Sequence, residues 1–206
     1  MTGATVLVEG VTHLAGRTTV LDDVSLTAEA GQLVVLSGRS GSGKTTLLHL
    51  LAGVQRPTRG SVIVLDRPAV DLHDWSLVSL TPQHSTVAGS LTVRENVLLP
   101  VALRGVDVDL ALLSDLTLDA IADQPATGTS LGEQQRTGIA RGLVLHPRVA
   151  LLDEPTSHQD DDNVERVLSV LLHARSGGTT LIVATHDPRV AAVADVVHHL
   201  AGGRLT

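Results

Sequence analysis

A glycine-rich segment near the start of the chain has the residue types needed to bind phosphate. The segment is Gly38-Arg39-Ser40-Gly41-Ser42-Gly43-Lys44-Thr45, and Thr46 directly follows it. Glycines permit backbone conformations that aim consecutive N–H groups at phosphate oxygens. In such a loop Lys44 places its charge on the β- and γ-phosphates of a nucleotide, while Thr45 offers its hydroxyl to Mg²⁺. Lys44 is the only lysine among 15 basic residues, so a composition that otherwise uses arginine has lysine only here.

Two adjacent carboxylates follow a short apolar run later in the chain. Residues 149–152 are Val-Ala-Leu-Leu, and Asp153 and Glu154 come next. Ligands of α/β sheets bind at the carboxyl ends of the strands, which is where these acids are expected. We expect Asp153 to hold Mg²⁺ and Glu154 to orient and activate a water molecule as a general base. The alternative is that the pair only marks a strand end that enters solvent.

Short apolar runs alternate with helical stretches, which is the pattern of an α/β protein. Buried strands are predicted at residues 33–36, 62–65, 77–80, 149–152 and 181–184. A helix is predicted at residues 44–52, because Leu47, Leu48 and Leu51 share one helical face. The glycine-rich segment therefore belongs to a strand–loop–helix unit, and the helix adds its positive dipole end to the loop.

The pattern changes to helix between residues 83 and 130. Helices are predicted at residues 93–103 and 110–122, with Arg104-Gly105 as the turn between them and Gln124-Pro125 after the second. This stretch therefore predicts a helical insertion within the α/β core.

Composition excludes several classes of function. A chain of 206 residues suits one domain with a sizeable core. Its net charge of -7 argues against a basic surface for nucleic acid, so no nucleic-acid partner is expected.

The absence of cysteine rules out disulfides and agrees with a reducing compartment. No apolar run approaches the roughly 18 residues that span a bilayer, and the start lacks a basic signal region, so any membrane role is expected to need a separate partner chain.

Taken in order, the motifs from Gly38 to His186 resemble those of the ATPase subunits of ABC transporters. The resemblance implies an α/β P-loop NTPase of ABC type, with a mixed β-sheet core, flanking helices, a small N-terminal antiparallel β part and an inserted α-helical subdomain. It implies a single ABC ATPase domain over residues 1–206, with the core at 1–82 and 131–206 and the helical subdomain at about 83–130. It also implies that ATP and Mg²⁺ are bound.

Three more residues match functional positions of that family. Gln83 matches a glutamine that touches Mg²⁺ or water and links the core to the helical subdomain, although alone it reads as an ordinary loop residue. His186 matches the switch histidine that contacts the γ-phosphate, and the resemblance makes it catalytic together with Glu154 and Gln83. Asp160 matches an aspartate that communicates across the ATPase dimer and completes the nucleotide site, and it fits equally well as the N-cap of the next helix.

Residues 129–136, Thr-Ser-Leu-Gly-Glu-Gln-Gln-Arg, occupy the place of the family signature. The resemblance implies that Ser130 and Gly132 contact the γ-phosphate of ATP held by a second subunit. Thr129 and Leu131 depart from the family pattern, where leucine and glycine are usual, and a branched side chain at 131 opposes close approach of the backbone to phosphate. A capping box formed by Ser130 and Glu133 explains the same residues as an ordinary helix start.

The family also places an aromatic residue near the N-terminus to stack on adenine. Residues 11–16 contain none, so we expect weaker ATP binding or poorer discrimination between bases, with His13 as a possible substitute.

Residues 89–100 and the ending Thr185-His186-Asp187-Pro188 resemble the lipoprotein-release and macrolide-export type of ATPase subunit. That resemblance implies an integral-membrane permease as partner, a homodimer or heterodimer of ATPase subunits, and a cytoplasmic location on the inner face of the cell membrane.

Three alternatives remain open at this point. Leu131 favours a weakly hydrolysing nucleotide switch that regulates a membrane partner, or the degenerate half of a heterodimer. A DNA-repair or translation-associated ABC ATPase is a third reading, but only one set of motifs is present, without a long inserted coiled coil.

Overall fold

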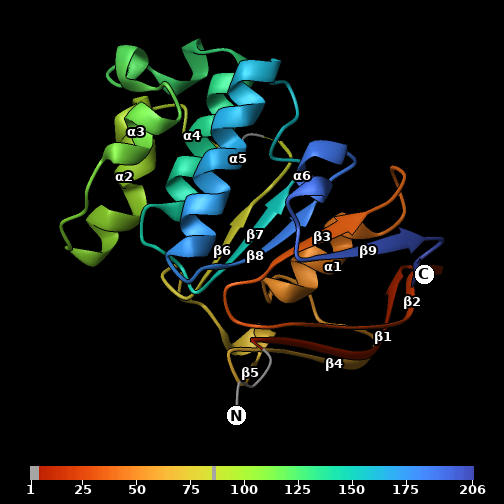
Figure 1. Cartoon of the computed structure of the whole chain (residues 1–206). Helices are drawn as coiled ribbons and strands as arrows, with labels where there is room; N and C mark the ends of the chain where they lie inside the picture. The colour runs from red at the N-terminus through yellow and green to blue at the C-terminus, as the bar shows by residue number, and fades with distance from the viewer. Residues whose placement is uncertain (1–4, 85–86) are drawn as a thin grey trace.

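The computed structural model describes residues 5–84 and 87–206. Residues 1–4 of the predicted core and residues 85–86 of the predicted helical subdomain lie outside the described residues. The elements form layers: a small sheet, one helix, a larger sheet, and a group of helices on the far side of that larger sheet (Figure 1).

The larger sheet has six strands in the spatial order β10-β9-β3-β8-β7-β6. All neighbours are parallel except β10, which runs antiparallel to β9. In chain order the strands are β3 (Leu33–Ser37), β6 (Val78–Thr81), β7 (Val149–Asp153), β8 (Thr180–Ala184), β9 (Val196–Ala201) and β10 (Arg204–Leu205). The predicted strands at 33–36, 77–80, 149–152 and 181–184 correspond to β3, β6, β7 and β8, and because the ends of parallel strands meet at one edge, the loops after them are neighbours.

The central strands are buried on both faces. Every residue of β7 and β8 is buried. Along β3, Leu33 and Val35 pack into one hydrophobic cluster, while Val34 and Leu36 pack into the other. Because side chains alternate between the two faces of a strand, a continuous apolar run supplies both cores at once.

The N-terminal part forms a second sheet of four antiparallel strands in the order β2-β1-β4-β5. These are β1 (Val6–Ala15), β2 (Thr18–Ala28), β4 (Arg59–Val64) and β5 (Arg67–Pro68). Helix α1 (Lys44–Leu51) lies between this sheet and the larger one, and its leucines join the cluster that both sheets share (Figure 1). The helix that follows the glycine-rich loop is therefore held from two sides.

The remaining α-helices cover the other face of the larger sheet (Figure 1). They are α2 (Val93–Arg104), α3 (Ala111–Asp115), α4 (Leu131–Leu143), α5 (Asp161–Ser176) and α6 (Pro188–Ala192), and three short 3-10 helices lie at Ala69–Asp71, Asp119–Ile121 and Ala126–Gly128. A capping box of Thr92 and Glu95 begins α2, and Gly105, at φ 63°, ends it as the predicted turn. Within the described part of the chain, no helix combines the length and apolarity required to cross a bilayer.

The helix predicted over residues 110–122 is broken, so that prediction was wrong in its extent. Helix α3 ends at Asp115, and Thr117 adopts a left-handed φ of 54° before the 3-10 turn. Leu113, Leu116 and Leu118 are all buried. A spacing of three and then two residues does not keep them on one helical face, so the chain must turn at Thr117 to bury the third.

Strand β9 carries two adjacent histidines that differ in exposure. His198 and His199 lie on β9, which the sequence analysis did not predict. His199 is exposed, whereas His198 is half-buried, and burial lowers its pKa.

Candidate functional site

The glycine-rich loop connects β3 to α1 and needs its glycines for two separate reasons. Gly38 and Gly43 have positive φ angles of 150° and 108°, which side-chain-bearing residues rarely adopt. A Cβ on Gly38 would collide with the carbonyl oxygen of Leu200, and one on Gly43 would lie 2.8 Å from Leu21 Cδ2. Backbone conformation and packing therefore both require glycine at these two positions.

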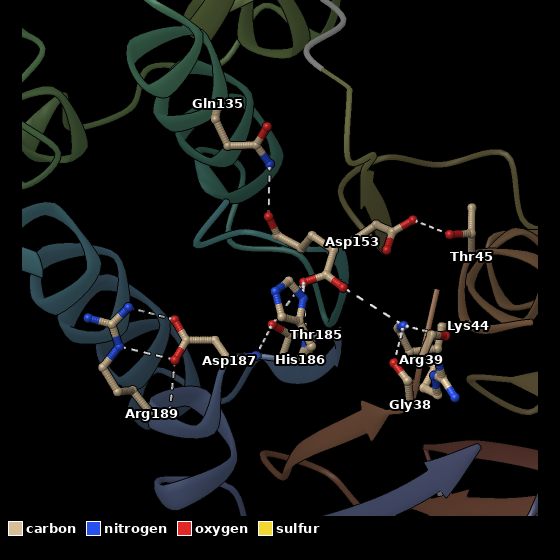
Figure 2. A network of polar contacts seen from close by, with 11 residues as sticks. Gly38, Arg39, Lys44, Thr45, Gln135, Asp153, Thr185, His186, Asp187 and Arg189 are labelled. Carbon is tan, nitrogen blue, oxygen red and sulfur yellow. Dashed lines mark hydrogen bonds and ion pairs between the residues drawn. The ribbon is translucent and has the colours of Figure 1, made fainter. Parts of the chain in front are cut away.

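Lys44 is buried at the start of α1, and its amine is held by the loop itself. Its Nζ donates hydrogen bonds to the carbonyl oxygens of Gly38, at 2.7 Å, and Arg39, at 3.4 Å (Figure 2). It also lies 3.8 Å from Glu154 Oε1. The only lysine of the chain thus holds its ammonium group against the loop, beside the carboxylates at the end of β7.

Thr45 and Asp153 join the loop to the end of β7. Thr45 Oγ1 donates a 2.6 Å hydrogen bond to Asp153 Oδ2 (Figure 2). Burial raises the pKa of Asp153 above the ordinary value, although the bond from Thr45 and the charge of Lys44 act in the opposite direction. A hydroxyl and a buried carboxylate are hard oxygen donors, and Gln83 adds an amide to the same pocket. This donor set fits Mg²⁺, which prefers oxygen ligands.

Glu154 has a strained backbone and a firmly held side chain. Its φ of 48° is unusual for a residue other than glycine, and its N–H donates to the Ala184 carbonyl at 2.7 Å. One carboxylate oxygen, Oε2, accepts hydrogen bonds from Thr185 Oγ1 at 3.1 Å and from the His186 N–H at 3.3 Å. His186 Nδ1 lies 3.0 Å from the same oxygen, while the side chain of His186 is 79% exposed.

These groups line one pocket of about 520 Å³. Its walls contain the whole glycine-rich loop, the predicted polar residues at or after the ends of three strands, and one valine of β2. The lining residues are Val20, Gly38, Arg39, Ser40, Gly41, Ser42, Gly43, Lys44, Thr45, Thr46, Gln83, Asp153, Glu154 and His186. The fold therefore brings the predicted phosphate, metal and water-activating residues together.

Ser130, Gly132 and Asp160 do not line that pocket. Ser130 caps α4: its hydroxyl accepts from the Glu133 N–H at 3.3 Å, and the Glu133 carboxylate accepts from the Ser130 N–H at 2.8 Å. This bond is the first cause of the lowered pKa of Glu133. Asp160 caps α5 by accepting from the Asn163 N–H at 2.8 Å. The two capping interpretations are thus present in the fold.

The two central signature residues have different surroundings. A Cβ on Gly132 would lie 2.6 Å from the carbonyl oxygen of His158, so packing within the chain itself requires glycine there. Leu131 is the first residue of α4, and the residue is 61% exposed. Packing within the chain therefore requires glycine at position 132, whereas it leaves room for the leucine at position 131.

Sequence reasoning missed two residues of the pocket region. Val20 lines the pocket from β2, and its apolar type within a strand gave no functional signal. Thr185 lies directly before His186 and bonds the Glu154 carboxylate, although only the histidine was singled out. His13, the suggested substitute for an aromatic, does not line the pocket, and its Nδ1 lies 3.1 Å from the Arg56 carbonyl oxygen.

A second pocket, of about 560 Å³, lies between the turn after α1, strand β6 and the helices α2 and α4. It is largely apolar, and its wall includes Trp75, the only aromatic residue of the chain, which is 55% exposed. We call this pocket the Trp75 groove; its lining residues are Ala52, Gly53, Val54, Leu72, His73, Trp75, Val78, Ser79, Leu80, Pro82, Leu99, Pro100, Gly138, Arg141, Gly142 and Leu145.

The sequence of the chain is similar to those of known transport proteins. A sequence model of the family described as ABC transporter matches residues 21–157. An uncharacterised ABC transporter ATP-binding protein of Mycobacterium tuberculosis is 39% identical over 204 residues, covering 92% of this chain and 82% of that protein. The lipoprotein-releasing system ATP-binding protein LolD of Rickettsia typhi is 37% identical over 195 residues, covering 90% and 88%.

A longer relative and a solved structure extend the comparison. The macrolide export ATP-binding/permease protein MacB of Salmonella choleraesuis is 35% identical over 199 residues, which are 90% of this chain but 31% of that protein. The dimeric, post-hydrolysis structure of the ATP-binding cassette MJ0796 with ADP and Pi superimposes with a TM-score of 0.89 at 29% identity, covering 97% of this chain and 96% of the other. The expected similarity to the lipoprotein-release and macrolide-export type is confirmed.

Proposed function

The chain belongs to the ABC transporter family as an ATP-binding ATPase subunit, and on that premise we propose that it hydrolyses ATP at the pocket around Lys44 to drive a membrane permease. The observation that carries the proposal is the meeting of Lys44, Thr45, Asp153 and Glu154 in one pocket. These residues come from the start of α1 and the end of β7, and the bond between Thr45 and Asp153 joins the two segments across 108 positions of sequence.

The glycine-rich loop supplies the phosphate-binding part of the site. Its backbone N–H groups and the N-terminus of α1 favour an anion, and Lys44 brings a full positive charge. At present that charge is satisfied by the carbonyls of Gly38 and Arg39. In the proposed complex Lys44 exchanges part of this bonding for the β- and γ-phosphates.

Thr45, Asp153 and Gln83 are the residues proposed to hold Mg²⁺. When bound, the ion neutralises charge that develops on the phosphate oxygens during transfer. Asp153 is buried and already bonded to Thr45, so its oxygen needs little rearrangement to face the nucleotide.

Glu154 is proposed as the base that orients the attacking water and takes its proton. His186 is proposed to contact the γ-phosphate, and its exposed ring beside the anchored Glu154 carboxylate supports this role. Most of the rate enhancement in phosphoryl transfer comes from positioning and electrostatics. The loops after β7 and β8 carry these two side chains, and the contacts of His186 with Glu154 Oε2 hold them together for that purpose.

A second ATPase subunit is proposed to complete each site. Ser130 and Gly132 lie outside the Lys44 pocket of their own chain, which is consistent with action on nucleotide bound by another chain. Asp160 begins the helix next to them and is proposed to face the same partner. The solved relative described above is itself dimeric.

The Trp75 groove is proposed as the place where the permease docks. It is bounded on one side by β6 and the turn after α1, both of the core, and on the other by α2 of the helical insertion. Exposed Trp75 and Val54 offer an apolar anchor surface of the kind that protein partners use. Through such a permease the chain is proposed to lie in the cytoplasm, on the inner face of the cell membrane.

One set of variants tests the ATPase function. Lys44→Ala is expected to lose ATP binding, whereas Glu154→Gln is expected to keep ATP, hydrolyse it at least about 100-fold more slowly and accumulate as a dimer. Arg94→Ala is the control, because Arg94 is an exposed partner of Asp123 and lines neither pocket. Rapid turnover by Glu154→Gln would contradict its role as base.

A separate experiment tests the docking groove. Trp75→Glu is expected to reduce copurification with an integral-membrane partner by about tenfold or more, since burying an unpaired carboxylate opposes docking. Asp107→Asn, in an exposed loop, is the control. If Trp75→Glu copurifies as well as the wild-type chain, the partner docks elsewhere.

Leu131 supports one alternative within the same family. Its exposed branched side chain stands where glycine would leave room for the nucleotide of the other subunit. We therefore keep, as a second candidate, a weakly hydrolysing subunit that acts as a switch or pairs with a different ATPase chain. Steady-state ATPase rates with and without the permease separate the candidates, because strong stimulation supports the pump.

A further inference from the structure

Thr185 connects the loop that carries His186 to the carboxylate of Glu154. Its side chain is buried, with 1% of the residue exposed. Its Oγ1 accepts a 3.0 Å hydrogen bond from the Asp187 N–H and donates a 3.1 Å bond to Glu154 Oε2. A backbone N–H can only donate, so the hydroxyl proton points toward the carboxylate.

The two oxygens of Glu154 are therefore not equivalent. Oε2 is occupied by donors from Thr185 and from the His186 backbone, and the His186 ring also faces it. Oε1 instead points toward Lys44 Nζ, at 3.8 Å, inside the pocket. An oxygen that already accepts several hydrogen bonds is a poorer proton acceptor than one that faces the pocket.

The main chain of Glu154 is already held in place, so only its side chain still has to be oriented. Its strained φ of 48° is held by the bond from its N–H to Ala184, the last residue of β8. Thr185 directly follows Ala184, so the same strand end fixes both the main chain and the side chain of Glu154.

Asp187, whose N–H donates to the Thr185 hydroxyl, is itself held in place by Arg189. Its carboxylate bonds Arg189 through both oxygens, at 3.0 and 2.9 Å (Figure 2). Arg189 also bonds Asp161, the first residue of α5, at 2.8 Å. The side-chain hydrogen bond from Arg189 is the first cause of the lowered pKa of Asp187, and a hydrogen bond with the Thr156 side chain lowers that pKa further. This clamp keeps the N–H of Asp187 aimed at Thr185.

We propose that Thr185 is a positioning residue that anchors Glu154 Oε2 and so presents Oε1 to the attacking water. The inference rests on the proposed ATPase function and names the oxygen that takes the proton. As the water oxygen bonds to the γ-phosphorus, one water proton passes to Oε1. The bond from the γ-phosphorus to the bridging oxygen breaks, and ADP leaves with that electron pair, so that ATP and water become ADP and phosphate.

The test compares variants of the full chain in single-turnover ATP hydrolysis and in nucleotide binding. Thr185→Val keeps the shape but removes the donor, and is expected to lower the hydrolysis rate at least about tenfold with an unchanged Kd for ATP. Thr185→Ser restores the hydroxyl and is expected to return the rate to within about threefold of wild type. Thr185→Ala replaces Thr185→Val in the comparison if the latter does not fold.

Thr179→Val is the matched control. Thr179 is buried directly before β8, and its hydroxyl donates to the Pro147 carbonyl at 2.8 Å, so the variant loses a buried hydroxyl at the opposite end of the same strand. It is expected to leave the hydrolysis rate unchanged in the fraction that folds. If Thr179→Val and Thr185→Val lower the rate equally, the effect is structural and the proposal is overturned.

A double variant separates this inference from the ATPase function itself. If Thr185 acts through Glu154, adding Thr185→Val to Glu154→Gln lowers the residual rate no further. A further tenfold loss in the double variant would overturn the proposal. Failure of the wild-type chain to hydrolyse ATP would instead contradict the proposed function, and full activity of Thr185→Val beside an inactive Glu154→Gln would contradict the inference alone.

Discussion

Thr45 Oγ1 donates a 2.6 Å hydrogen bond to the buried carboxylate of Asp153, so the start of α1 and the end of β7 are joined directly. The bond aligns two oxygen donors before any ion is present. Burial disfavours the charged form of this carboxylate and is the first cause of the raised pKa of Asp153.

Asp153→Asn is expected to stabilise the nucleotide-free protein at neutral pH. The pKa of Asp153 is higher in the folded than in the unfolded chain, so the stability that this group contributes is present below the unfolded value and is lost as pH rises through the folded value. Removing the charge avoids that loss, and we expect a rise in Tm of a few degrees at about pH 7, shrinking as pH approaches about 4. Thermal unfolding across this pH range measures it.

The same variant is expected to lose the extra stabilisation that Mg²⁺ gives to the ATP complex. Asp107→Asn, which removes an exposed carboxylate, controls for the change in net charge. An Asp153→Asn protein that is less stable than wild type at neutral pH and still responds fully to Mg²⁺ would contradict both assignments.

Gln159→Ala is expected to lower the free energy of unfolding by about 1–3 kcal/mol. Gln159 Oε1 accepts from Arg136 Nη1 at 2.6 Å, and its Nε2 donates to the Gly132 carbonyl at 3.0 Å. Arg136 is buried, and burial lowers its pKa, so losing a partner leaves a costly unpaired donor. Urea unfolding measures the change.

Gln134→Ala is the control for that loss, because Gln134 is on α4, the helix of Arg136 and Gly132, and its side chain bonds the Thr129 carbonyl at 2.9 Å. We expect it to cost less than Gln159→Ala. Equal losses in the two variants would show that the bonds to Arg136 and Gly132 add nothing.

Leu131→Gly and Gly132→Ala are expected to differ in what they change. Gly132→Ala forces a Cβ against the His158 carbonyl and is expected to destabilise the fold by about 1–3 kcal/mol. Leu131→Gly removes an exposed side chain, costs about 1 kcal/mol or less, and is expected to raise the ATPase rate several-fold by clearing the contact surface for nucleotide. Unfolding curves and ATPase rates of both variants provide the comparison. An unchanged rate in Leu131→Gly would remove the argument for a degenerate signature.

The protein is expected to discriminate poorly between adenine and guanine nucleotides. Stacking on an aromatic contributes about 1–3 kcal/mol, and the pocket wall contains Val20 instead. We expect the Kd values of ATP and GTP to agree within about threefold, and His13→Ala to change them less than twofold, because the His13 ring contacts Arg56 outside the pocket. A tenfold preference for ATP that disappears in His13→Ala would reverse this assignment.

Much of the fold was predictable because its strongest elements have local signals. The apolar runs of β3, β7 and β8 are buried on both faces, and α2 begins and ends at a capping box and a glycine. By contrast, β9 alternates partly exposed residues and includes two adjacent histidines, so its sequence does not show that it pairs with β3. That pairing depends on contacts between segments about 160 positions apart, such as the bond from the Leu33 N–H to Asp195.

The candidate site follows the same division. Lys44, Asp153, Glu154 and His186 were predictable because each ends or follows a recognisable apolar run or loop. The hydroxyl of Thr185 and the wall position of Val20 were not, because only the three-dimensional arrangement shows which way a threonine proton points or which valine faces a pocket. Gly132 shows a related limit. The signature motif explains the glycine by nucleotide bound to another subunit, whereas the structure explains it by packing against His158 within this chain.

The lone tryptophan in the Trp75 groove makes the protein its own optical probe. Because no other tryptophan, and no tyrosine or phenylalanine, is present, ultraviolet emission from the chain arises from that groove alone. Trp75 is about half exposed, so a partner that covers it replaces water around the indole and shifts the emission toward shorter wavelengths. Association with a membrane partner that contains no tryptophan can therefore be followed in real time on the unlabelled wild-type chain.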